Sequence, residues 1–188
     1  MNRSAYGLAA AALLVGSVPL VMAARSLDRP AHQEASKLRL AGDGAPFGAA
    51  LPSVRIGEVR SFGGAMLCVT TTAVTITSVA PVDPAGGFAV QAWGVRPNPF
   101  RSGGVGLGAE PKPLAAFPAF GHTPVSGRCS DDSQSFELGV QVAKPGTATA
   151  TTHGLRVDYT SNGKAGSMVV PMTIQLCAAG DHTGHCGQ

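Results

Sequence analysis

The chain has 188 residues, of which 14 are Lys or Arg and 11 are Asp or Glu, and its formal net charge is +3. Charged residues make up 13 % of the chain, aromatic residues make up 5 %, and no run of Lys or Arg occurs, which argues against nucleic-acid binding. The 25 glycines and 14 prolines disfavour long helices. The length suits one domain with a full core, together with export and linker segments.

Residues 1–24 predict export from the cytoplasm. Arg3 supplies a short positive region, and residues 5–24 form an uncharged run that is near the length a helix needs to cross a bilayer. The small-residue pattern at residues 21–23 favours cleavage after Ala23, whereas the length of the run favours retention as a membrane anchor. Both alternatives stay open, and both place the rest of the chain outside the cytoplasm.

Residues 25–53 mix charged residues with Ala, Gly and Pro and show no sustained period, so we expect a flexible linker. From residue 54 the pattern changes to short runs of alternating apolar and polar residues that are bounded by turn residues. We therefore expect the folded domain to span residues 54–177. The predicted strands before its last hairpin are residues 54–59, 65–71, 74–78, 88–95, 134–142 and 147–152.

Residues 154–177 form the clearest β-hairpin of the sequence. Asn162 and Gly163 lie between two alternating runs, and this dipeptide suits the positive-φ positions of a hairpin turn. Pro171 interrupts the second run, so that strand is expected to lie at a sheet edge or to contain a bulge. The inward positions of the hairpin are predicted to be Leu155, Val157, Tyr159, Met168, Val170, Met172, Ile174 and Leu176.

About seven short strands with no amphipathic helix between them predict an all-β fold, an antiparallel β-sandwich. Residues 96–128 are a Gly- and Pro-rich insertion of a length that compact domains seldom leave without structure. Its Leu114 and three phenylalanines are expected to pack locally, in the manner of a lid on one end of the sandwich. A binding role for this loop is the alternative.

Four cysteines, Cys68, Cys129, Cys177 and Cys186, lie beyond the export segment. An even number in an oxidising compartment predicts two disulfides, and four cysteines allow three pairings. We favour Cys68 with Cys129 and Cys177 with Cys186, because the second pair would close a short loop and fasten the tail to the last strand. The alternation of that strand predicts that Cys177 points away from the core.

The C-terminal tail, residues 178–188, supplies the alternative to the second disulfide. The residues Cys177, His182, His185 and Cys186 offer soft and borderline ligands within a short stretch, which suits copper or zinc. Their spacing matches no strong zinc template, so the disulfide is preferred and no cofactor is expected. An enzymatic function is not indicated either, because the sequence lacks a Gly-x-Ser-x-Gly or His-Glu-x-x-His motif.

The run GLRVDY at residues 154–159 and the closing run IQLC at residues 174–177 resemble the C-terminal end of small uncharacterised exported proteins of high-GC Gram-positive bacteria. That group is similar in plan, with a hydrophobic N-terminal helix, a linker and an immunoglobulin-like or fibronectin-like β-sandwich. The resemblance implies a location in the cell envelope and transfers no active site. The cysteine and tryptophan positions of a true immunoglobulin domain are not met.

We therefore expect a non-enzymatic exported β-sandwich module, either secreted or anchored to the cell membrane by a single N-terminal helix. Its expected partner is another envelope protein or a cell-wall component, and the membrane itself if the export segment is uncleaved. The candidate contact surfaces are the sheet edge around Pro171 and the insertion at residues 96–128. The alternative function is an extracytoplasmic copper- or zinc-binding protein that uses the C-terminal Cys and His residues.

Overall fold

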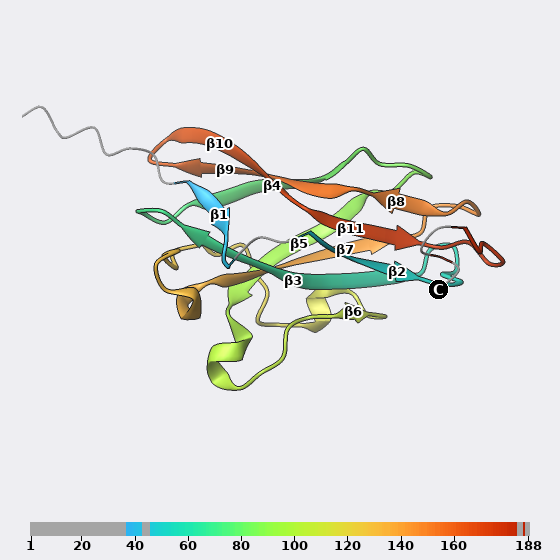
Figure 1. Cartoon of the computed structure of the whole chain (residues 1–188), viewed down its shortest axis with the longest axis horizontal. Coiled ribbons are helices and arrows are strands. Elements are labelled where there is room, and N and C mark those ends of the chain that lie inside the picture. Colours follow the sequence, from blue (N-terminus) through green and yellow to red (C-terminus); the bar gives the residue numbers. More distant parts are fainter. Residues whose placement is uncertain (1–36, 43–45, 184–185, 187–188) are drawn as a thin grey trace, which may run out of the picture. The chain divides into compact units, whose positions relative to one another are not determined.

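The computed structural model describes residues 37–42, 46–183 and 186, and these residues are built mainly from β-strands (Figure 1). Three short 3-10 helices accompany the strands, η1 (Pro99–Ser102), η2 (Leu114–Ala116) and η3 (Asp132–Gln134). The strands are β1 (Leu38–Leu40), β2 (Phe47–Leu51), β3 (Val59–Val69), β4 (Thr75–Val82), β5 (Val90–Pro97), β6 (Ala109–Glu110), β7 (Phe136–Ala143), β8 (Ala150–Thr152), β9 (Gly154–Ser161), β10 (Lys164–Val170) and β11 (Met172–Leu176).

The export segment and its predicted helix lie outside the described residues. Within the described part of the chain, no helix is long and apolar enough to span a membrane.

The strands form two facing layers, as expected for an all-β sandwich (Figure 1). One layer is the sheet β1-β3-β7-β5, with β6 paired to β3. The other layer contains the sheets β10-β9-β4 and β2-β11-β8. All of these pairs are antiparallel except β2 with β11, which is parallel.

Successive side chains of a strand point to opposite faces of its sheet, so each layer has one apolar face. The apolar faces of the two layers pack against each other and form the core. The hairpin of β9 and β10 follows the prediction, and its turn residues Asn162 and Gly163 have φ values of 49° and 74°. Met168 is partly buried against the core, and the other predicted inward residues of the hairpin are buried in it. The largest fully buried apolar side chains are Phe62, Leu67, Leu138, Leu155, Ile174 and Leu176.

Pro171 is the point at which the chain changes sheet. β10 before it pairs with β9, whereas β11 after it lies between β2 and β8. Proline has no N–H for a ladder, so a break at this position costs no hydrogen bond. The carbonyl of Pro171 is used, since it accepts a hydrogen bond from the Phe47 amide at 3.1 Å. The expectation of an edge holds for β10, while β11 is an inner strand.

Two expectations about the N-terminal part of the domain are wrong. Residues 54–58 form a turn rather than a strand, and β3 begins at Val59. The linker expected through residue 53 instead contributes β1 and β2 to the two layers. Leu38 is only 3 % exposed, and the apolar residues of β2 pack on the core. β1 has only three residues, and β2 is rich in Gly and Ala, so the sequence carries too few alternations to show either strand.

The insertion at residues 96–128 covers the outer face of β5 and β7 instead of one end of the sandwich (Figure 1). Its β6 pairs with β3, and Leu114 of η2 is buried. A Cβ built on Gly139, whose neighbours Leu138 and Val140 face the core, would lie 2.6 Å from the Phe120 ring. The ring therefore sits directly on the outer face of β7. Phe100, which was expected to fold down with the others, is 59 % exposed.

Candidate functional site

The open edge of β2 is the strongest candidate for a binding surface. In the parallel pair, Phe47, Ala49 and Leu51 stand opposite Met172, Ile174 and Leu176. The Phe47 amide donates to Pro171 and the Leu51 carbonyl accepts from Cys177, so the odd-numbered residues of β2 bond to β11. The amides and carbonyls of Gly48 and Ala50 therefore point away from β11. Among the described residues, no strand pairs with this side of β2.

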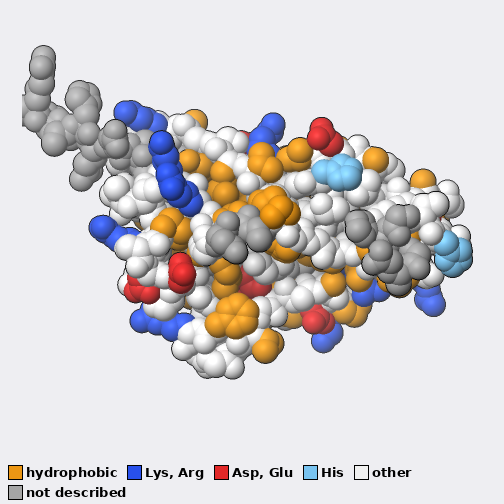
Figure 2. All heavy atoms as spheres, in the orientation of Figure 1, with side chains coloured by type: hydrophobic (Ala, Val, Ile, Leu, Met, Phe, Trp, Pro, Cys, Tyr) orange, Lys and Arg blue, Asp and Glu red, His pale blue; other side chains and the backbone are white. Residues whose placement is uncertain are grey.

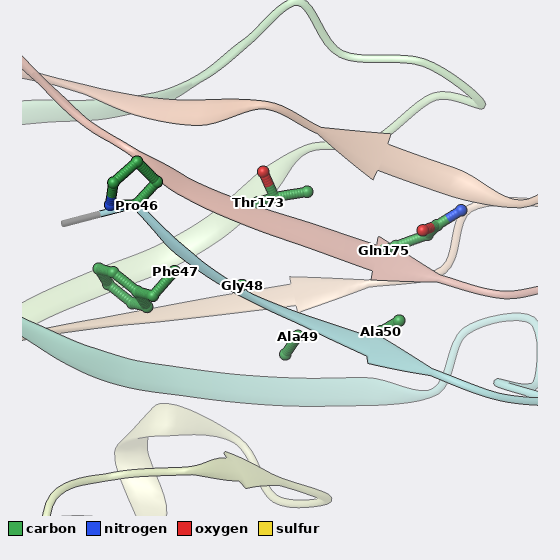
Figure 3. Close-up of a pocket in the computed structure, with 7 residues that line it drawn as sticks. All are labelled: Pro46, Phe47, Gly48, Ala49, Ala50, Thr173 and Gln175. Atoms are coloured by element: carbon green, nitrogen blue, oxygen red, sulfur yellow. The ribbon is translucent and has the colours of Figure 1, made fainter. Parts of the chain in front are cut away.

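A groove of about 480 Å³ accompanies this open edge, and we call it the β2 edge groove (Figure 3). None of the described residues that line it is charged. The outward side chain of Gln175 stands at one end of the groove and Pro46 at the other (Figure 3). Its lining residues are Pro46, Phe47, Gly48, Ala49, Ala50, Thr173 and Gln175.

Small residues leave the open edge of β2 without bulky side chains. A Cβ built on Gly48 would lie 2.7 Å from the Thr173 carbonyl oxygen, so a larger residue could not occupy this position without a shift. β2 contains no charge, no internal proline and no bulge, which are the features that usually block an exposed sheet edge. The arrangement suits the addition of an extended segment from a partner, through backbone hydrogen bonds to Gly48 and Ala50.

The second candidate surface, the insertion at residues 96–128, is held on the sandwich by backbone hydrogen bonds to an ion pair between β5 and β7. The carboxylate of Glu137, a fully buried residue of β7, lies 2.6 Å from both Nε and Nη2 of Arg96. Its other oxygen accepts hydrogen bonds from the amides of Gly64 and Leu107, at 3.0 and 2.6 Å. The Arg96 guanidinium also lies 4.7 Å from the centre of the Phe120 ring.

These contacts account for the charged pair of Arg96 and Glu137 at this position without a bound ligand. All acceptor positions of the carboxylate face protein donors, as a buried charge requires. The sequence pattern places Glu137 on the solvent side of its strand, and it gives no signal that the insertion covers that side. The large apolar residues that the insertion exposes are Phe100 and Val105, the latter 80 % exposed.

The four cysteines form the two favoured disulfides, Cys68–Cys129 and Cys177–Cys186. Disulfides are typical of proteins in oxidising compartments, outside the cytoplasm. The expectation that Cys177 points away from the core is wrong, since Cys177 is fully buried. It directly follows the inner strand β11, and its amide continues the hydrogen bonding of β11 to β2 by donating to Leu51. The buried Lys144 ammonium donates to the Cys177 and Val54 carbonyls at 3.2 and 3.1 Å, a contact that no sequence pattern indicates.

Neither tail cysteine is available as a thiolate ligand in this arrangement, because both belong to one disulfide. His182 is exposed, and His185 lies outside the described residues. Within the described part of the chain, no group of three or more His, Cys, Asp or Glu residues is placed to hold a metal ion.

The described part of the tail is anchored through Asp181. The Thr149 hydroxyl donates to the Asp181 carboxylate, and the Ala178 amide donates to Thr149 Oγ1 at 2.9 Å. The hydrogen bond from Thr149, followed by those from Thr183, lowers the pKa of Asp181 to about 2. At the start of η3, the Asp131 carboxylate accepts a hydrogen bond from the Ser133 amide at 3.0 Å.

Comparison with known proteins gives no family assignment: no family model matches the chain, and no curated protein matches it.

Proposed function

We propose that the chain is a non-enzymatic, exported β-sandwich module that binds another component of the cell envelope through the β2 edge groove. The observation that carries this proposal is the open edge of β2, where Gly48 and Ala50 present unpaired backbone groups beside an uncharged groove. Backbone hydrogen bonds supply the affinity of strand addition, and pockets beside the strand supply its specificity. The partner's contacting part is an extended, uncharged protein segment.

The exported location is supported by the apolar run at residues 5–24 and by the two disulfides. In this proposal the run at residues 5–24 is a cleaved signal peptide or a membrane anchor, and the sandwich acts outside the cytoplasm.

An immunoglobulin-like class, as in the exported proteins that the sequence resembles, is part of this proposal. Its support is the division of the first two strands between the layers, with β1 paired to β3 and β2 paired to the last strand, β11. The disulfides differ from the immunoglobulin pattern, because Cys129 follows the insertion rather than lying on a late strand.

The test is site-specific photo-crosslinking in the cells that produce the protein, with the crosslinking residue at Gln175 beside the groove. We expect a discrete adduct that Ala50→Lys abolishes, because a lysine on this edge hinders strand addition. The matched control is Val169→Lys, which adds the same charge at an exposed position of β10. A crosslink that is unchanged by Ala50→Lys, or the absence of any adduct at Gln175, would contradict the proposal.

A further inference from the structure

A second concave surface, between β1 and β10, is basic. It is a cleft of about 370 Å³ with Lys37 and Arg39 on the β1 side and Lys164 on the β10 side. The other described residues of its lining are uncharged. Figure 2 shows Lys and Arg side chains at the end of the domain where β1 and the β9–β10 turn lie, at the upper left. The described lining of the β2 edge groove, by contrast, carries no charge.

The three cations of this basic cleft are not neutralised by the fold. Lys37, Arg39 and Lys164 are exposed, and none forms an ion pair with another described residue. Among the described acidic residues, Asp158 of β9 is the nearest in register, and it stands opposite Ser167 of β10. Its carboxylate accepts a hydrogen bond from Ser78 at 2.8 Å and lies 3.4 Å from Arg156 Nε, so it is engaged by other residues.

We propose that the basic cleft binds a linear polymer that carries phosphate groups along its length. Lys and Arg are the usual protein ligands of phosphate. The cations stand on both walls of a concave surface, so a chain that lies in the cleft meets all three, whereas a flat bilayer would meet the rims alone. This inference goes beyond the proposed function, because the cleft is separate in its lining residues from the β2 edge groove.

The test measures binding of linear inorganic polyphosphate to the full chain in non-ionic detergent, at several salt concentrations. Three phosphate contacts predict a slope of about −2 for the logarithm of the binding constant against the logarithm of salt concentration, by analogy with single-stranded nucleic acids. The triple variant Lys37→Gln, Arg39→Gln, Lys164→Gln is expected to bind about tenfold more weakly, with a slope near zero. Its three side chains are exposed, and its thermal unfolding should match that of the parent.

The matched control removes three exposed cations elsewhere, Arg55→Gln, Arg101→Gln and Lys112→Gln, and so lowers the net charge equally. This variant should retain the affinity of the parent within about twofold. Equal losses in both triple variants would overturn the proposal in favour of general charge attraction, as would the absence of polyphosphate binding by the parent. Dependence on the cleft cations for phosphatidylglycerol vesicles alone would overturn it in favour of a membrane surface.

Discussion

Glu137 on β7 and Arg96 on β5 stand opposite each other and form an ion pair, 2.6 Å apart, on the outer face of their sheet. Glu137 is shielded from solvent there, and the Leu107 amide of the insertion donates to its carboxylate. Glu137→Gln keeps an oxygen for the Gly64 and Leu107 amides but leaves the guanidinium of Arg96 without its counter-charge. Removing one partner of a buried pair costs about 3 to 5 kcal/mol, and we expect about 3 kcal/mol because Arg96 retains some exposure. Urea unfolding measures this change in free energy.

The same substitution should loosen the insertion before the sandwich unfolds. Trypsin cleavage after Arg101, an exposed residue of the insertion, should accelerate in Glu137→Gln relative to the parent. Glu110→Gln in β6 is the control and should leave both measurements close to those of the parent. Parent-like stability in Glu137→Gln would show that the pair does not hold the insertion.

Lys144 ties the turn at residues 54–58 to the end of β11 through its ammonium group. Lys144→Met keeps the length and apolar contacts of the side chain and deprives the Val54 carbonyl of its donor. We expect a loss of about 1 to 3 kcal/mol in the free energy of unfolding, which is the usual cost of an unsatisfied buried polar group. Lys112→Met, at an exposed position, should change stability by less than about 0.5 kcal/mol. A neutral or stabilising Lys144→Met would refute this role.

The two disulfides should contribute unequally to stability. Cys68 and Cys129 are 61 residues apart in sequence, whereas Cys177 and Cys186 are 9 apart. Loop-closure entropy in the unfolded chain gives about 4 kcal/mol for the longer loop and about 2.5 kcal/mol for the shorter one. Paired Cys→Ala variants, compared by urea unfolding, should therefore rank in that order. The reverse order would mean that chain entropy is not the main contribution of these bonds.

Asp181 should give the domain a specific response to acid. Its pKa is lowered from 3.8 to about 2 by the hydrogen bond from Thr149, so the folded state binds a proton less readily than the unfolded state. The resulting stabilisation is complete above pH 3.8 and is lost as the pH falls through about 2. The difference in melting temperature between the parent and Asp181→Asn should shrink over this interval. A difference that stays constant between pH 5 and pH 2 would contradict the assignment.

The fold class, the disulfide pairs and the hairpin of β9 and β10 could be predicted from the sequence, because long alternating runs and an Asn-Gly turn are local signals. β2 could not be predicted, since FGAAL has no polar alternation and its pairing with β11 joins residues more than 120 positions apart. The burial of Glu137 could not be predicted either, because it depends on where the insertion folds. The candidate site at β2 is therefore a property of the tertiary structure, even though Pro171 marked its neighbourhood.

The openness of the β2 edge is the claim on which the functional account depends. Amide hydrogen exchange of the isolated protein, resolved by residue, tests it without a partner. The account predicts slow exchange at Ala49 and Leu51, whose amides point to β11, and fast exchange at Gly48 and Ala50, whose amides point outward. If Gly48 and Ala50 were protected as strongly as Ala49, the edge would already be occupied, and binding by strand addition at β2 would be contradicted.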